Sequence, residues 1–117
     1  MANEFTASVT GSFNKNSATD IFSASNSVTI SGSYFNSGIQ LVGTSDEVIA
    51  LIDIGTVGWV FFKNLDATNF VTAGADGAAY PIKIKAGEAC LFRWNGAAVH
   101  VIADTAEVKL QYKIFED

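Results

Sequence analysis

The C-terminal segment of the chain alternates strictly between polar and apolar residues. From Glu107 to Ile114 the even-numbered residues are apolar and the odd-numbered residues are polar or charged. Successive side chains of a strand point to opposite faces, so this pattern predicts a half-buried antiparallel strand over Ala106–Phe115. Pro81–Lys85 repeats the pattern, with Ile82 and Ile84 on the inward face. No window carries a capped apolar stripe of helical period, so helix is not expected.

Short strands separated by turn residues dominate the second part of the sequence. Because such spacing is typical of sandwiches and barrels, we expect an all-β fold, an antiparallel jelly-roll-like β-sandwich. The Asn95-Gly96 dipeptide further predicts a tight hairpin that pairs its two flanking strands. The expected strands are Glu47–Asp53, Gly58–Lys63, Asn69–Ala73, Pro81–Lys85, Ala89–Trp94, Ala98–Ala103 and Ala106–Phe115.

The N-terminal part is more polar than the rest of the chain. The 117 residues fit one domain, with a Ser/Asn-rich part at 1–44 and a dense strand core at 45–117. Ser12–Asn26 has little to bury, which predicts an extended loop or an arm that orders on a partner. Bulky apolar residues in this polar part are candidate interface anchors, or else they pack on the chain's own sandwich. They are Phe5, Phe13, Ile21, Phe22, Tyr34 and Phe35.

The composition indicates that part of the protein surface is buried against other subunits. Hydrophobic residues make up 49% of the chain and charged residues 16%, against a usual charged share of about 25%. Monomers seldom expose large apolar patches, so the surplus predicts contacts with other subunits. The net charge of −5 repels phosphate backbones, and direct nucleic-acid binding is therefore not expected.

Residues that carry chemistry are scarce. His100 is the only histidine and lies between Val99 and Val101, so it should point away from the face of those valines and have a structural or rim role. Cys90 is the only cysteine and sits in an apolar run, which favours a core position. No nucleophile motif, phosphate-binding loop or closed zinc site can be assembled, so we expect no catalytic residue, no metal and no cofactor.

Two weaker interpretations remain open. Asp66, Asn69 and Asp76 carry oxygen ligands that calcium uses, although ordinary turn roles are favoured. The chain start lacks the pattern of a signal peptide, and the longest apolar segment, 48–62, is shorter than the roughly 18 residues of a spanning helix. We therefore expect no membrane contact, and a single cysteine fits synthesis in a reducing cytoplasm.

Four segments of the second half carry a family resemblance: Gly55–Val71, Pro81–Glu88, Leu91–Arg93 and Ala103–Val108. In these segments the chain resembles small virion structural proteins of tailed bacteriophages. It implies a capsid cement or decoration subunit on the capsid surface, made in the host bacterial cytoplasm. Its implied partners are the major capsid protein and copies of itself, as a homodimer or homotrimer. A component of the tail or its fibres is the alternative within the same resemblance.

A carbohydrate-binding module is the alternative from another class. Trp59, Trp94 and Tyr80 could act as stacking platforms for sugar rings, together with Phe92. Each lies in an apolar strand segment and buries a large area, so core packing is the favoured role for all four.

Overall fold

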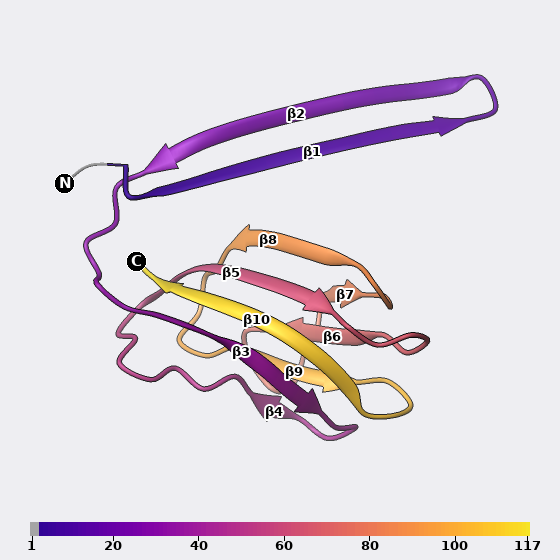
Figure 1. The fold of residues 1–117 in the computed structure, drawn as a ribbon. Helices are drawn as coiled ribbons and strands as arrows, with labels where there is room; N and C mark the ends of the chain where they lie inside the picture. The colour runs from indigo at the N-terminus through magenta and orange to yellow at the C-terminus, as the bar shows by residue number, and fades with distance from the viewer. Residues whose placement is uncertain (1–2) are drawn as a thin grey trace. The chain divides into compact units, whose positions relative to one another are not determined.

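The computed structural model describes residues 3–117, and within this range it contains ten strands and no helix. The chain forms two compact units, Met1–Ser31 and Gly32–Asp117. The first unit is a two-stranded hairpin and the second contains two four-stranded sheets (Figure 1). All neighbouring strands run antiparallel, so the predicted all-β antiparallel class is confirmed.

The hairpin consists of β1 (Phe5–Lys15) and β2 (Ala18–Val28), which pair along their whole length. Asn16 turns the chain with a φ of 56°, a left-handed conformation that asparagine tolerates better than most residues. The loop predicted over Ser12–Asn26 is therefore wrong. The backbone groups of serine and threonine residues satisfy their hydrogen bonds in this ladder although the side chains are not buried. A prediction based on buried residues therefore does not find these two strands. The role of this segment as an arm stays a prediction.

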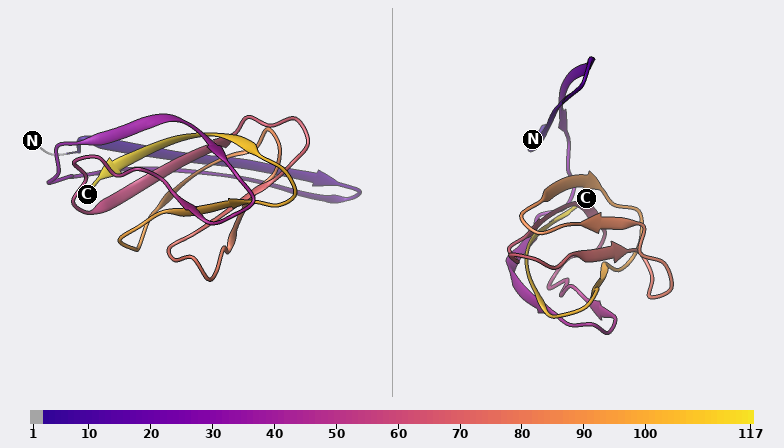
Figure 2. Two further views of the ribbon diagram at one scale, coloured as in Figure 1. Left: turned by 90° about the horizontal axis from the view of Figure 1, so that it is seen from below. Right: turned by 90° about the vertical axis from the view of Figure 1, so that its right-hand side faces the viewer.

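The second unit contains eight strands in two sheets. Their bounds are β3 (Phe35–Val42), β4 (Glu47–Val48), β5 (Val57–Asn64), β6 (Val71–Gly74), β7 (Ile82–Ile84), β8 (Ala89–Arg93), β9 (His100–Ala103) and β10 (Val108–Glu116). The first sheet has the order β3-β10-β5-β8 and the second the order β4-β9-β6-β7. Further views show the strands of this unit surrounding a common interior, as in a β-sandwich (Figure 2).

The pairing of these eight strands is nested. β3 pairs with β10, β4 with β9, β5 with β8 and β6 with β7, so the first strand of the unit meets the last. Two further pairings, β10 with β5 and β9 with β6, complete the sheets. Residues far apart in sequence therefore become neighbours, as Phe35 and Phe115 do.

The core lies between the two sheets and follows the predicted alternation. On β10 the side chains of Val108, Leu110 and Ile114 are fully buried, and Tyr112 packs against them half-buried. On β7 Ile84 is buried and Ile82 packs against the core, as predicted. The other buried members of this cluster are Val42, Ile49, Ile54, Val57, Val60, Phe62, Val71, Ala73, Trp94, Val99, Val101 and Ala103.

The hairpin predicted around Asn95-Gly96 is wrong. β8 belongs to the first sheet, where it pairs with β5, whereas β9 belongs to the second and pairs with β4 and β6. The Trp94 side chain enters the core where the chain leaves β8, and its indole N–H donates a hydrogen bond to the Ala98 carbonyl at 3.0 Å. The segment therefore crosses from one sheet to the other instead of reversing within one sheet.

The strand expected over Glu47–Asp53 is shorter than predicted. β4 ends at Val48, although the Ile49 N–H still donates to the Val99 carbonyl at 2.9 Å. Asp53 has a φ of 61°, which lies outside the strand region. The end of this apolar segment is consequently a turn.

Candidate interaction surfaces

The hairpin has one apolar face and one hydroxyl-rich face. Residues directly opposite each other on paired strands share a face, so odd-numbered residues of β1 lie with even-numbered residues of β2. The face that we call the apolar hairpin face comprises Phe5, Ala7, Val9, Gly11, Phe13, Ala18, Phe22, Ala24 and Val28, with Lys15, Asp20 and Asn26. On the opposite face lie Thr6, Ser8, Thr10, Ser12, Asn14, Thr19, Ile21, Ser23, Ser25 and Ser27.

Most of the interface candidates in the hairpin are exposed. Ile21 is 78% exposed, Phe22 54% and Phe13 53%, whereas Phe5 is half-buried. Within the described residues this sheet contains β1 and β2 alone, so its two outer edges carry backbone groups with no strand beside them. A two-stranded hairpin is at best marginally stable in water, which makes this unit an incomplete sheet.

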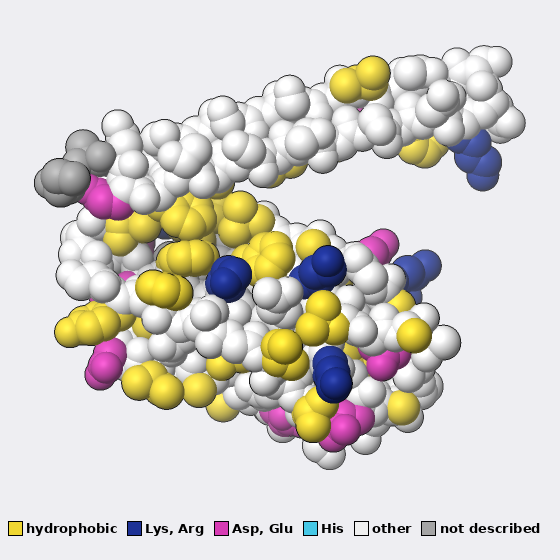
Figure 3. Space-filling model, viewed as in Figure 1, with side chains coloured by type: hydrophobic (Ala, Val, Ile, Leu, Met, Phe, Trp, Pro, Cys, Tyr) yellow, Lys and Arg dark blue, Asp and Glu magenta, His cyan; other side chains and the backbone are white. Residues whose placement is uncertain are grey.

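A second surface covers the outward side of the first sheet. Its apolar members are Phe35, Ile39, Leu41, Trp59, Phe61, Leu91 and Phe115, and four basic side chains lie among them: Lys63, Arg93, Lys109 and Lys113. We call it the outer face of the first sheet. Figure 3 shows hydrophobic and basic side chains intermixed over β3, β10 and β5.

This outer face is both apolar and positive. It holds four of the seven Lys and Arg residues, and none of its strand positions is acidic, although Arg93 forms an ion pair with Asp117 at 3.1 Å. Phe35 is 61% exposed and stacks on Phe115, with ring centroids 5.8 Å apart, and Tyr34 beside it is 57% exposed. The two interface candidates outside the hairpin therefore lie at the edge of this sheet.

A polar cluster lies on the second sheet. Nδ1 of His100 is 3.0 Å from Oδ2 of Asp46, and the Tyr80 hydroxyl donates a hydrogen bond to Oδ1 of the same carboxylate. The hydrogen bond from Tyr80 is the largest cause that lowers the pKa of Asp46, and the same bond raises the pKa of Tyr80 to about 12. His100 points away from the buried Val99 and Val101, as predicted.

The single thiol, Cys90, lies on β8 in the other sheet, half-buried, and burial raises its pKa to about 11. A thiol with such a pKa is protonated at neutral pH, and a protonated thiol is a poor nucleophile. Sequence reasoning missed Asp46 because no local pattern connects it with His100, which lies 54 residues away.

The three candidate calcium ligands lie in loops whose carboxylates bind backbone groups. Oδ2 of Asp66 accepts the N–H groups of Thr68 and Asn69, at 3.0 and 2.6 Å. Oδ1 of Asp76 likewise accepts two N–H groups of its own loop, and these bonds lower the pKa of both carboxyls. Residues 3–117 contain no group of three or more His, Cys, Asp or Glu placed to hold a metal ion.

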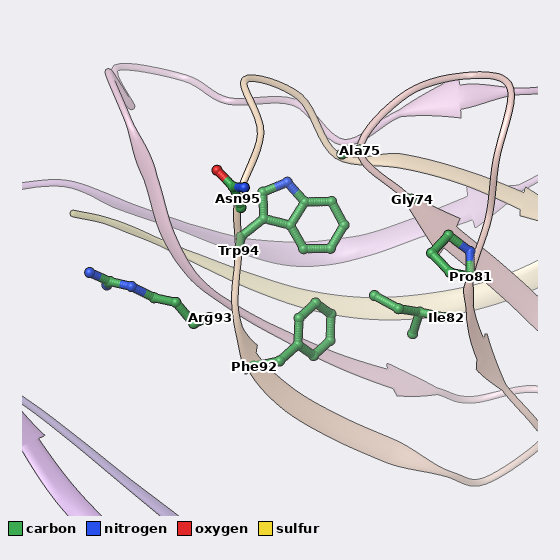
Figure 4. A pocket seen from close by; sticks show the side chains of 8 residues that line it. All are labelled: Gly74, Ala75, Pro81, Ile82, Phe92, Arg93, Trp94 and Asn95. Atoms are coloured by element: carbon green, nitrogen blue, oxygen red, sulfur yellow. The ribbon is translucent and has the colours of Figure 1, made fainter.

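The aromatic residues considered for sugar stacking have separate positions. Trp94 is only 7% exposed and packs on Phe92 at 5.4 Å, so little of its ring surface is accessible to a ligand. A hollow of about 200 Å³ opens beside these two rings, and Arg93 points away from them (Figure 4). Trp59 lies half-buried on the outer face of the first sheet, and Tyr80 belongs to the polar cluster of the second.

No protein-family model, curated protein or solved structure matches this chain. The described residues contain no helix that is long and apolar enough to cross a membrane. The function proposed below therefore rests on the two surfaces and on the resemblance noted in the sequence.

Proposed function

We propose that this chain is a non-enzymatic structural subunit that assembles with other polypeptides, as a capsid cement or decoration protein on a head shell. The observation that carries the proposal is the hairpin: its two strands have 11 residues each, Val9, Phe13 and Phe22 on its apolar face are at least half exposed, and no other described strand lies beside it. Covering that face and pairing the hairpin's edges on a neighbouring chain would supply the stabilisation that two strands alone lack.

The topology of the second unit supports the same function. We infer that the nested pairing of eight strands into two four-stranded sheets is that of a jelly roll. Jelly rolls form viral capsid proteins and also lectin domains, so the fold alone does not select a function. The burial of Trp94 weighs against sugar stacking and leaves the shell component favoured.

The outer face of the first sheet indicates the chemistry of a partner. A chain of net charge −5 that gathers four basic side chains on one apolar sheet face fits a neighbouring surface that is apolar and carries carboxylates. We assign this role to the major capsid protein, with the hairpin contacting the same shell or another copy. Exposed charge pairs of this kind weaken as salt rises, because the Debye length falls below about 10 Å.

Quantifying the chain in particles tests the proposal. Virus particles are purified from the cells that make the protein, and the chain is counted by quantitative mass spectrometry and located by cryo-electron microscopy. A cement protein is expected in hundreds of copies on the head. A few copies, or a few dozen at the tail, would instead support the tail or fibre alternative, and absence from every particle would overturn the assembly function.

Rebinding to stripped particles tests the outer face of the first sheet. Lys109→Glu reverses one charge on that face, and Lys85→Glu makes the same change in the loop after β7. Both lysines are exposed, so folding should survive in both variants. We expect Lys109→Glu to weaken rebinding at least tenfold and Lys85→Glu to have little effect; equal effects would contradict the assignment.

A further inference from the structure

We infer that the chain forms a two-fold dimer in which β1 pairs antiparallel with β1 of a second copy, with Val9 of each copy at the axis. The first observation is that the β1 edge is unprotected. Proteins usually guard edge strands with charges, prolines or bulges, because a bare edge pairs with other chains. Phe5–Asn14 contains no charged residue and no proline, and its register with β2 has no bulge.

The second observation is that the sequence of β1 is palindromic in chemical type about Val9. Reading outward from Val9, each residue meets one of the same kind at the same distance on the other side. The matched pairs are Ser8 with Thr10, Ala7 with Gly11, Thr6 with Ser12, and Phe5 with Phe13. Antiparallel pairing about Val9 therefore places hydroxyl residues opposite hydroxyl residues and an aromatic residue opposite an aromatic one, which are favourable cross-strand pairs.

This register also keeps the two faces of the sheet consistent. Odd-numbered residues of one copy lie opposite odd-numbered residues of the other, so the apolar hairpin faces join into one. A shift by one residue would place Phe5 and Phe13 among serines and threonines. The result is a four-stranded sheet with a continuous apolar face, and three or more strands with such a face are what independent stability requires.

Charge complementarity favours a second copy of the chain as the partner of the β1 edge. Glu4 directly precedes β1 and Lys15 ends it, and both are exposed; one carboxylate oxygen of Glu4 accepts the Ile30 N–H at 2.8 Å. Antiparallel pairing brings the acidic start of one strand beside the basic end of the other, at both ends of the interface. The edge of β2 is less suited to pairing with a second copy. It carries the charged Asp20, and antiparallel pairing of two β2 strands centred on Ser23 would place Ile21 opposite Ser25.

The pairing deepens the proposed function and rests on it, since an open strand edge serves a chain that assembles. Of the two expected oligomers, the homodimer and the homotrimer, this pairing selects a two-fold dimer, and the edge of β1 is its interface.

The test begins with the mass of the full chain in solution, measured by light scattering. The wild type is expected at twice the monomer mass. Val9→Lys places two like charges face to face at the axis, and because Val9 is 50% exposed the substitution is tolerated within one copy. We expect this variant to be monomeric with an unchanged melting temperature of the sandwich unit. A monomeric or trimeric wild type would overturn the inference.

Ala24→Lys is the matched control. Ala24 lies directly opposite Val9 on β2 and shares its face, but it is one strand further from the proposed axis. Edge pairing leaves the two Ala24 residues about 14 Å apart, three strand spacings of roughly 4.8 Å, so this variant stays dimeric. If Ala24→Lys also dissociates the dimer, the two copies pack face to face and the edge pairing is wrong.

Spin labels measure the register even if a charged variant fails to fold. Residue 15 lies six positions from the axis, so labels on Lys15→Cys are expected about 40 Å apart at roughly 3.4 Å per residue. Labels on Val9→Cys are expected within about 10 Å of each other, because the paired positions themselves lie about 5 Å apart. The unmodified chain, with Cys90 alone, gives the background. Similar distances at both positions would exclude an antiparallel pairing about Val9.

The two proposals fail in different ways. A chain that is monomeric in solution but abundant on the head shell loses the β1 pairing and keeps the assembly function. A chain that dimerises through β1 but is absent from particles keeps the pairing and loses the cement role.

Discussion

The ring of Phe22 lies over Gly11, its partner directly across the hairpin. A Cβ atom placed on Gly11 would clash with Cζ of this ring, far inside van der Waals contact. An aromatic side chain that covers a cross-strand glycine compensates for the packing that the glycine lacks. The glycine in β1 is therefore matched to a particular residue of β2.

This contact predicts a ring-current shift. One α-proton of Gly11 should resonate well upfield in the NMR spectrum, and Phe22→Leu should return it to its usual position. Gly11→Ala should displace the ring and weaken the hairpin by up to about 1 kcal/mol, the range of cross-strand pairs. Phe13→Leu, on the same face, is the control and should leave the Gly11 shift in place.

The buried Asn64 predicts a large stability loss on removal of its amide. Its side chain is 0% exposed, its Nδ2 donates to the carbonyls of Asn69 and Ile84 at 2.9 and 3.0 Å, and its Oδ1 accepts the Asp66 N–H at 2.8 Å. Asn64→Leu leaves these groups without partners, so the free energy of unfolding should fall by about 2–5 kcal/mol. Urea unfolding measures it, and the exposed Asn95→Leu should change it by no more than about 0.5 kcal/mol.

Glu116 predicts a loss of stability in acid. Its carboxylate accepts the N–H groups of Ser33 at 2.8 Å and Gly55 at 2.7 Å, and these bonds hold its pKa below the ordinary 4.5. A depressed pKa in the folded state contributes stability above the unfolded pKa, and this contribution is lost as the pH falls through the folded value. Glu116→Gln should therefore lower the melting temperature at pH 7 and make little difference near pH 2.

The control for that experiment is the exposed Glu107→Gln. Its melting temperature should follow the wild type across the whole range. A difference between Glu116→Gln and wild type that grows on acidification would contradict the sign of the effect.

Tyr80 predicts a titration in alkali that depends on Asp46. The hydrogen bond to Asp46 raises the pKa of Tyr80 to about 12, whereas its ordinary value is 10.0. Asp46→Asn removes the charge and should lower the pKa of Tyr80 towards 10.0. The tyrosinate absorbance, recorded for each variant against pH, shows this as one tyrosine that titrates earlier. Asp20→Asn, in the hairpin, should leave the titration curve as it is.

Cys90 predicts slow thiol chemistry in the folded chain. Because burial raises its pKa to about 11, little thiolate exists at pH 8. A chromogenic disulfide reagent should react with the folded protein at least tenfold more slowly than with the chain in denaturant. Equal rates would show that the thiol is accessible and its pKa ordinary.

The sequence alone determined where most of the sandwich strands lie and which faces they bury. Alternation assigned Val108, Leu110 and Ile114 to the core, because a period of two residues is a local property of an extended backbone. The same reasoning placed His100 on the side opposite Val99 and Val101. It failed for Ser12–Asn26, because the many Ser, Asn and Thr residues of this segment are typical of loops and hide the weaker alternation of its strands.

Only the tertiary structure decided which strands pair and which distant side chains meet. The alternation of residues in a strand shows which face is buried but not which strand lies beside it. The Asn95-Gly96 turn signal predicted that β8 pairs with β9, but these strands belong to different sheets. The contact of Asp46 with His100, and the gathering of Lys63, Arg93, Lys109 and Lys113 on one face, depend on the nested pairing of strands far apart in the chain. Local residue patterns carry no record of such long-range pairing.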